Sequence, residues 1–512
     1  MGVAASVSPS VPVVAAAAAP ENQSQQNALF AHDMVDFLQY QVCATPALSG
    51  SVHDSACSYE VVDKAVAEHF HPLLLELSRL SFFRHFKVDL GKACPFWPDD
   101  DGMCASVDCA VCECPTHEIP AKWFLMDQQF KHARRSPTSV PATASEPCAD
   151  QTGESELSRV DRTNAEAGES FRAWEERPRA DLWGAQGDEG ERMAYIDLLK
   201  NPERYTGYSG IQAERVWHAI YEENCFTPPD EASVTGMCLE ERVYYRLISG
   251  LQASINTHIS LRYKYGDDSW GVNPALFVHR VGKHRERLQN LYFTYLFVMR
   301  AIGRYRHQLL EYDYDTGNDG DDARVVEILR TLVLEDRPVD GATGSTASCP
   351  TELTSVLSGF DERALFKVDS EGLSADQFVT ALEEKRQLEE QFRGKFQNVS
   401  RIMDCVTCEK CRLWGKIQTM GIGTAIKILL VDDVADLEAL NRNELIALIN
   451  VANNLARSVD GVKMMRQHEF VAVVKQVAVI CGGASLVVAL LIFIVRKVNT
   501  RRQARRRRRK AD

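Results

Sequence analysis

The stretch VVDKAVAEHFHPLLLELSRLSFFRHF, residues 61–86, has the hydrophobic spacing that decides the fold class. Its apolar residues recur at positions i, i+3, i+4 and i+7, which gathers them on one face of an α-helix. The same spacing is present at 211–223, 239–262, 284–311, 361–397, 412–429 and 443–467. We find no sustained alternation of apolar and polar residues and no hairpin turn signal. The sequence therefore predicts a mainly α-helical fold, a single helical bundle with cysteine-bearing loops.

The C-terminal region predicts one transmembrane helix. Residues 477–495 carry no charged side chain and include the run LVVALLIFIV. At about 1.5 Å per residue they reach roughly 28 Å, which is close to the thickness of the hydrocarbon core of a bilayer. The basic stretch RKVNTRRQARRRRRK follows at once. By the positive-inside rule we expect the tail, 496–512, to be cytosolic and the body of the chain to be lumenal.

Charge and composition distinguish residues 26–470 from the N-terminal segment and from two polar insertions. The chain has 512 residues, and positions 1–495 hold 48 basic against 70 acidic side chains, which argues against a nucleic-acid partner. Residues 1–25 resemble a signal peptide but lack a positive n-region, so we expect an atypical signal region there. Residues 133–190 and 313–360 have polar compositions that predict disordered insertions. We expect 26–470 to form one lumenal domain around them.

The 15 cysteines cluster at two places, and the first cluster is CVTCEKC. It contains Cys405, Cys408 and Cys411. A CxxC pair at a helix start suits redox chemistry, because the helix N-terminus and the nearby Lys410 and Arg412 would lower the pKa of a thiolate. CxxC is also half of a zinc site, and CAVCEC at 109–114 would supply the other half. Spacing leaves both interpretations open, and the predicted lumenal location favours redox.

The second cluster is CPFWPDDDGMCASVDCAVCEC, residues 94–114. Four residues separate Cys104 from Cys109, in a loop that contains Gly and Asp. A labile disulfide in such a loop would suit a shuttle of electrons. Five cysteines so close together also fit a purely structural set of disulfides, which spacing alone favours.

Both clusters closely resemble the endoplasmic reticulum oxidoreductin family, the flavoprotein oxidases of protein disulfide isomerase. The resemblance extends to YIDLLKNPERYTGYSG, RVWHAIYEENCF, RVYYRLISGLQASINTHIS, RLQNLYFTYLFVMRA and RIMDCVTCEKCRLWGKIQTMGIGTAIKIL. It covers most of 40–130 and 190–470. The resemblance implies a helical domain that holds FAD without a Rossmann fold. The chain agrees, since GIGTAI at 421–426 follows a helix and not a strand.

The resemblance implies a role for most cysteines. Cys104 and Cys109 would be the outer, shuttle pair. Cys408 and Cys411 would be the inner pair, with Cys408 facing the shuttle and Cys411 at the flavin. The implied structural bridges are Cys94–Cys405, Cys225–Cys238 and Cys43–Cys57. The roles of Cys112, Cys114, Cys148 and Cys349 stay open, and inhibitory disulfides with the shuttle pair are one option.

The resemblance also implies the flavin contacts and the reaction. The implied FAD-binding residues are Arg204, Thr206, Trp217, Ser249, Gln252, Arg287 and Arg300. Arginine forks suit a pyrophosphate and tryptophan can stack on a ring. Gln252 stands where the family usually has His. The implied enzyme reoxidises protein disulfide isomerase, reduces oxygen to hydrogen peroxide and supports oxidative folding in the endoplasmic reticulum. We expect no metal, and the motif NVS predicts glycosylation at Asn398.

Overall fold

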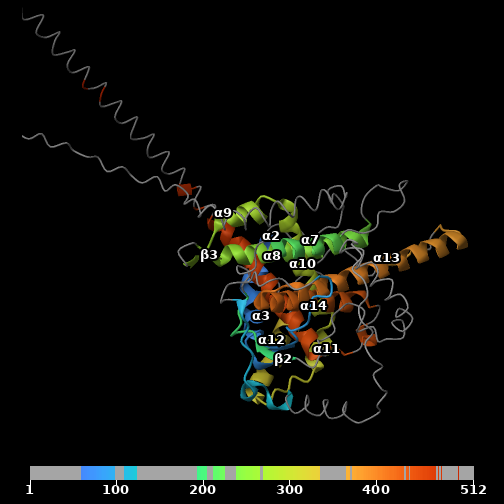
Figure 1. Ribbon diagram of the computed structural model, residues 1–512, viewed down its shortest axis with the longest axis horizontal. Helices are drawn as coiled ribbons and strands as arrows, with labels where there is room; N and C mark the ends of the chain where they lie inside the picture. The colour runs from blue at the N-terminus through green and yellow to red at the C-terminus, as the bar shows by residue number, and fades with distance from the viewer. Residues whose placement is uncertain are drawn as a thin grey trace, which may run out of the picture. The chain divides into compact units, whose positions relative to one another are not determined.

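The computed structural model describes residues 59–97, 109–123, 193–203, 211–224, 238–265, 269–334, 365–368, 372–431, 434–437 and 439–468, with positions 471, 474, 475, 494 and 497. The chain divides into two compact units, residues 1–460 and 461–512. The named helices and strands all lie in the first unit (Figure 1). In the second unit, residues 461–468 are helical.

Helices make up most of the first unit. In chain order they are α2 (Tyr59–Ala65), η1 (Val66–Phe70), α3 (His71–Leu77), α4 (Ser81–Arg84), η3 (Thr116–Glu118), α7 (Ile211–Glu223), α8 (Leu239–Leu261), α9 (Pro274–Phe277), η5 (Val278–Gly282), α10 (Arg285–Arg304), α11 (Arg306–Glu311), α12 (Asp319–Leu334), α13 (Ala375–Ile402), η8 (Met403–Cys405), α14 (Glu409–Leu430) and η9 (Val434–Asp436). Residues 442–460 are also helical. The strands are β1 (His85–Val88), β2 (Ala194–Asp197), β3 (Tyr263–Lys264) and β4 (Trp270–Gly271).

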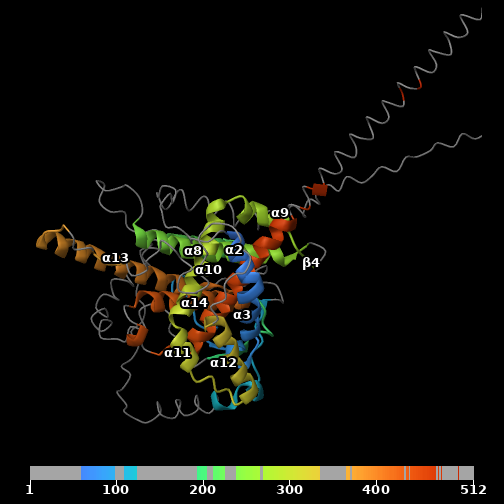
Figure 2. The same ribbon diagram turned by 180° about the vertical axis from the view of Figure 1, so that it is seen from behind.

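The core is centred on α10, which packs along α8 and also against α14 (Figures 1 and 2). A methyl group at Gly250 of α8 would overlap the hydroxyl of Thr294 and the carbonyl of Asn290 on α10. The glycine therefore lets the two helix backbones approach closely. Large side chains of α10, such as Tyr292 and Phe293, are completely buried. Their burial supplies much of the apolar stabilisation of this unit.

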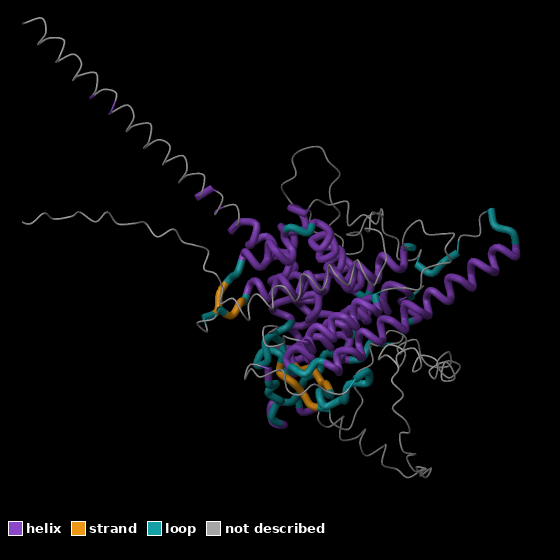
Figure 3. The backbone as a smooth tube through the Cα atoms, turned by 45° about the horizontal axis from the view of Figure 1, so that its top comes forward, coloured by secondary structure: helices purple, strands orange, loops and turns teal. Residues whose placement is uncertain are grey.

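A small sheet joins the cysteine-bearing residues 109–114 to this helical body. β1 pairs antiparallel with β2, with His85 opposite Asp197. Next to β2, the N–H of Cys114 donates to the carbonyl of Tyr195 at 2.8 Å. The second sheet pairs β3 with β4, and both sheets are the orange segments of Figure 3. The sequence predicted neither sheet, because strands of two to four residues are too short to show alternation.

The mainly α-helical prediction agrees with these elements, but its transmembrane helix requires a correction. A helix needs about 20 mostly apolar residues to cross a bilayer. None of the helices in the part of the chain that the structure describes is both long and apolar enough to do so. The longest of them, α13, carries Glu, Lys and Arg along its 28 residues. Of the predicted span 477–495, only Ile494 is described. The described helices and strands form a mainly α fold.

A second correction concerns the predicted insertion at 313–360. Its first part is ordered, because α12 occupies 319–334 and buries Val325, Ile328, Leu329 and Leu332. The Asp-rich start of this segment has a polar composition, which led to the prediction of disorder although an apolar face follows. Acidic residues in a first helical turn are favourable because they face the positive end of the helix dipole. Residues 1–25 and 133–190 lie outside the described ranges, so the predictions for them, like the limits of 26–470, stay predictions.

Candidate active site

Three buried cysteines stand where η8 passes into α14. Cys405 is the last residue of η8, Cys408 is the N-cap of α14 and Cys411 lies in its first turn. The CxxC pair is thus at a helix start, as the sequence predicts. This position brings the two cysteines to the positive end of a helix of 22 residues.

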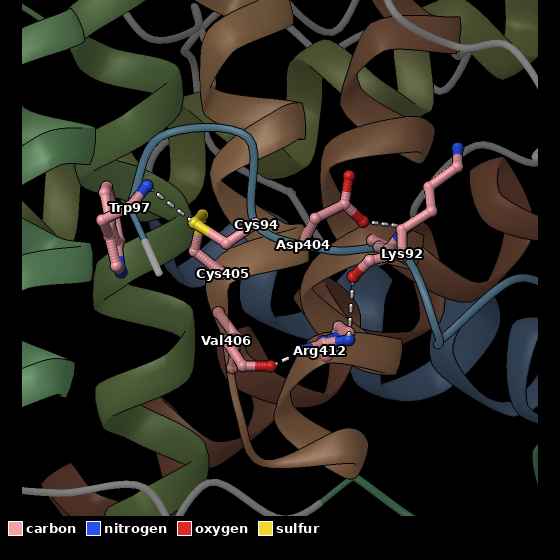
Figure 4. The surroundings of a disulfide bond; sticks show 8 residues. Lys92, Cys94, Trp97, Asp404, Cys405, Val406 and Arg412 are labelled. Atoms are coloured by element: carbon pink, nitrogen blue, oxygen red, sulfur yellow. Dashed lines mark hydrogen bonds and ion pairs between the residues drawn. A yellow bond between two sulfur atoms is a disulfide. The ribbon is translucent and has the colours of Figure 1, made fainter. Parts of the chain in front are cut away.

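A disulfide joins Cys94 to Cys405 across 311 residues of sequence (Figure 4). The Cα atoms of the two cysteines are 4.4 Å apart. Arg412 adds to this link, because its guanidinium donates to the carbonyls of Leu90 and Lys92. Residues 90–97 are thereby fixed to the start of α14.

A second disulfide joins Cys109 to Cys408, with their Cα atoms 5.1 Å apart. Cys411 is therefore a buried thiol and is not bonded to Cys408. Cys104 lies outside the described residues. The structure thus links one cysteine of the outer cluster to one cysteine of the inner cluster, and it does not close the predicted Cys408–Cys411 pair.

The residues that follow Cys109 are hydrogen-bonded to the elements around the inner cluster. The N–H of Val111 donates to the carboxylate of Glu409 at 2.8 Å. The N–H of Cys112 donates to Oδ1 of Asn201, also at 2.8 Å. The carbonyl of Asn201 in turn accepts a hydrogen bond from the indole of Trp414 on α14, at 3.0 Å.

The surroundings of Cys411 disfavour its thiolate. Burial raises the pKa of the Cys411 thiol to about 12, and the carboxylate of Glu203 contributes to the rise. The sequence predicts the opposite, namely that Lys410 and Arg412 lower the pKa of a thiolate here. The guanidinium of Arg412 instead donates to backbone carbonyls. Desolvation outweighs the helix N-terminus, and Cys411 is held as a neutral thiol.

A buried polar cluster around Glu203 was not found from the sequence. Its carboxylate accepts hydrogen bonds from Arg457 and, at 3.1 Å, from Gln418 of α14. Burial raises the pKa of Glu203 to about 7 despite the charge of Arg457. Burial also holds the pKa of His258 well below its usual range. The 3.8 Å approach of His258 to Glu203 is therefore not an ion pair.

Five of the residues that the resemblance assigned to FAD lie on three helices of the same unit. They are Trp217 on α7, Ser249 and Gln252 on α8, and Arg287 and Arg300 on α10. The other two, Arg204 and Thr206, lie outside the described residues.

Hydrogen bonds tie these helices together at the same positions. The amide of Asn290 donates to the hydroxyl of Ser249 at 3.0 Å, from α10 to α8. The hydroxyl of Tyr221 donates to the side-chain carbonyl of Gln252, from α7 to α8. Arg287 is buried on α10. Ser249 and Gln252 thus join α8 to α10 and to α7, respectively.

The family model of Endoplasmic Reticulum Oxidoreductin 1 (ERO1) matches residues 69–462, most of the chain. The chain belongs to the ERO1 family. Endoplasmic reticulum oxidoreductin-1 of Arabidopsis thaliana is 40% identical over 421 residues, 81% of this chain and 79% of that protein. ERO1-like protein alpha of Rattus norvegicus is 34% identical over 453 residues, 80% and 89% of the two chains. A solved structure of S. cerevisiae Ero1p has 26% identity and a TM-score of 0.49, covering 82% of this chain and 100% of that one. The resemblance found in the sequence is confirmed, and the protein is an ERO1-family oxidoreductase.

Other cysteines of this ERO1-family chain differ in exposure. Cys112 is exposed and Cys114 is half-buried, and neither is in a disulfide. Cys238 is at the N-cap of α8. Its implied partner Cys225 lies outside the described residues, so the Cys225–Cys238 bridge stays a prediction. Cys43, Cys57, Cys148, Cys225 and Cys349 lie outside the described residues.

The zinc alternative requires thiolates from both clusters. Cys405 and Cys408 are engaged in disulfides, so their sulfurs are not available as thiolate ligands. Within the described ranges, His, Cys, Asp and Glu side chains form no group of three or more that could hold a metal ion.

The burial of Asn398 argues against the predicted glycan. Asn398 lies on α13, and its side chain is 2% exposed. A sugar on its amide nitrogen would have to displace the packed neighbours, so we do not retain this prediction for the folded chain.

Proposed function

We propose that this ERO1-family chain is a lumenal, FAD-dependent thiol oxidase of the endoplasmic reticulum. It would reoxidise a protein disulfide isomerase, reduce oxygen to hydrogen peroxide and so support oxidative protein folding. The bond between Cys109 and Cys408 carries the proposal. A sulfur–sulfur link between the two clusters is the intermediate that exchange between an outer and an inner disulfide requires.

The first exchange takes two electrons from the partner. One thiolate of the reduced isomerase attacks the Cys104–Cys109 disulfide, and its second thiolate then attacks the mixed disulfide. The partner leaves with a disulfide, while Cys104 and Cys109 become thiols. Two sulfur–hydrogen bonds are lost in the partner and two are gained in the outer pair, so protons and electrons balance.

The second exchange moves the same two electrons inward. The Cys109 thiolate attacks Cys408, the Cys408–Cys411 bond breaks, and Cys411 takes up a proton because its pKa is high. This step leaves the Cys109–Cys408 bond and the Cys411 thiol that the chain carries. Cys104 then attacks Cys109 and releases Cys408. The outer disulfide is restored and the inner pair is reduced.

The residues on α7, α8 and α10 fit the chemistry of FAD. Arg287 and Arg300 provide guanidinium groups for a pyrophosphate, and Trp217 provides an aromatic face. Ser249 and Gln252 provide hydrogen-bonding groups, although Gln252 cannot carry a charge. Together with Arg204 and Thr206, these residues would hold the cofactor. FAD, when bound, accepts the electron pair of the inner cysteines and delivers it to oxygen. Of that pair, we assign Cys411 to the cofactor and Cys408 to the shuttle.

The proposal is tested on the purified full chain. We expect a flavin absorption spectrum and oxygen consumption when reduced protein disulfide isomerase is added, with one hydrogen peroxide formed per isomerase disulfide. Cys408→Ala and Cys411→Ala should each abolish this activity. The control is Glu383→Ala, which removes an exposed carboxylate on α13. A colourless protein, or full activity in Cys408→Ala, would refute the oxidase assignment.

A further inference from the structure

The side chain of Asn201 is paired with the backbone of the outer cluster. Its Oδ1 accepts from the N–H of Cys112 and its Nδ2 donates to the carbonyl of Cys112, both at 2.8 Å. The amide thus satisfies both backbone groups of one residue, as a neighbouring strand would. Asn201 is 0% exposed, so its side of these two bonds is shielded from water, whereas Cys112 itself is exposed.

Asn201 is itself held rigidly between β2 and α14. Its Nδ2 also donates to the carbonyl of Asp197, the last residue of β2, at 3.0 Å. Its own carbonyl accepts from the indole of Trp414 at 3.0 Å. Asn201 therefore ties the backbone of Cys112 to β2 and to α14, the helix at whose start the inner cysteines lie.

Glu409 holds the preceding residue of the same segment. Its Oε2 accepts from the N–H of Val111 at 2.8 Å. Glu409 is the first residue of α14 and follows Cys408 directly. Val111 is two residues after Cys109, so this hydrogen bond joins the neighbourhoods of the two reacting sulfurs.

Thiol–disulfide exchange requires the attacking sulfur to meet the disulfide along its axis, and positioning of this kind can supply a large part of the rate. Two side chains, from a segment after β2 and from the start of α14, fix the backbone within three residues of Cys109. We infer that Asn201 and Glu409 form a docking cradle that positions Cys109 for exchange with Cys408. This role rests on the proposed function. Both are positioning residues, since these hydrogen bonds are to backbone groups and not to the reacting sulfurs.

The test compares two routes to the inner pair in the full chain. Reduced protein disulfide isomerase acts through Cys104 and Cys109. Dithiothreitol serves as the small reductant. In a Cys104→Ala/Cys109→Ala variant the outer pair is absent, so the rate of oxygen consumption with dithiothreitol reports the direct reduction of the inner pair, which we call the bypass route. Oxygen consumption with each reductant is measured in the wild type and in the cradle variants.

We expect the isomerase route to slow about tenfold in Asn201→Ala and about threefold in Glu409→Ala, which lose two and one hydrogen bonds to this segment. Glu409→Gln should recover most of the rate, because its amide oxygen still accepts from Val111. The bypass rate, measured in the Cys104→Ala/Cys109→Ala background, should not change with either cradle substitution.

A second measurement follows the exchange step itself. In Cys104→Ala the mixed disulfide cannot be resolved by Cys104, so the peptide pair linked through Cys109 and Cys408 accumulates. After acid quenching and alkylation, mass spectrometry gives its rate of formation. Adding Glu409→Ala or Asn201→Ala should slow that rate by the same factors as above.

The outcomes separate the cradle from a general structural role. Equal slowing of both routes, or an unchanged rate of mixed-disulfide formation in both variants, would overturn the cradle. Glu409 is exposed, so Glu409→Ala keeps the test valid if Asn201→Ala does not fold. Glu383→Ala, at an exposed carboxylate paired with Arg386 on α13, is the control and should change neither route. A wild type inactive with both reductants would refute the proposed oxidase and not the cradle.

Discussion

The carboxylate of Glu203 raises the pKa of the Cys411 thiol, and both groups are buried in the same unit. The negative charge disfavours a second negative charge on the sulfur nearby. Because Glu203 itself has a pKa of about 7, its effect on Cys411 changes with pH in the neutral range. This pair therefore couples the protonation of an inner cysteine to that of a residue outside the cysteine clusters.

Glu203→Gln should lower the pKa of Cys411. The change removes the charge, so the pKa should fall from about 12, yet it should stay above the ordinary value of 9.0 because burial is the larger cause. The pH dependence of Cys411 alkylation, followed by mass spectrometry in Cys104→Ala protein, measures it. Glu383→Gln is the control for a distant carboxylate. A Cys411 pKa that is equal or higher in Glu203→Gln would contradict the coupling.

The same substitution should change how stability depends on pH. The Glu203 carboxyl titrates near 4.5 when unfolded and near 7 when folded, so between these values the folded chain binds more protons. The protonated Glu203 therefore adds to the free energy of unfolding below pH 4.5, by up to about 3 kcal/mol. This contribution is lost as pH rises through about 7. Wild-type stability should therefore fall relative to that of Glu203→Gln across this window.

Urea unfolding of both proteins at several pH values measures this difference. His258 acts in the opposite direction, because burial lowers its pKa and the unfolded ring gains a proton below about pH 6.5. It is present in both proteins, so its effect largely cancels when they are compared. If the free energies of unfolding of wild type and Glu203→Gln differ by the same amount at every pH from 4.5 to 7, the raised pKa of Glu203 is contradicted.

Removal of the Cys94–Cys405 bridge should destabilise the fold strongly. The bridge joins residues 311 positions apart, and a loop of this length is expected to contribute about 3–5 kcal/mol through the entropy of the unfolded chain. The double change Cys94→Ala/Cys405→Ala should lower the urea midpoint accordingly. Cys112→Ala, at an exposed thiol, should leave it nearly unchanged. Equal midpoints for the double variant and the wild type would argue against a structural role.

Gly250→Ala should disturb the packing of α8 on α10. The added methyl group would overlap Thr294 and the backbone of Asn290, a type of overpacking that costs about 1–3 kcal/mol. Because Ser249 and Gln252 flank this position, flavin content should fall as well. The matched control is Gly394→Ala on α13, where a methyl group meets nothing within 4 Å. There, the better helix propensity of Ala should stabilise the protein by up to about 1 kcal/mol. Similar thermal stabilities for the two variants would contradict the close approach.

Long periodic segments made much of the helical core predictable. The spacing at 239–262 predicted α8 to within one residue, and the spacing at 412–429 lies inside α14. The prediction at 361–397 began too early, since α13 starts only at Ala375. Ser374 and Gln377 form a capping box there, a start signal that the sequence contains.

The site was less predictable, because its contacts join distant parts of the chain. Glu203 is one acid in a polar stretch, and only the fold brings Arg457 and Gln418 to it. The bond between Cys109 and Cys408 likewise depends on how the outer segment lies on α14. Spacing could identify both cysteine clusters, but it could not say which sulfurs meet.

The bridge between Cys94 and Cys405 also constrains the order of events during biosynthesis. Cys94 leaves the ribosome about three hundred residues before its partner. Until Cys405 is translated, Cys94 is near four other cysteines, at positions 104, 109, 112 and 114. Each of these could close a short, non-native ring with it. The nascent chain must therefore keep Cys94 reduced, or have a wrong bond reshuffled, before the inner cysteines can be assembled against the outer ones.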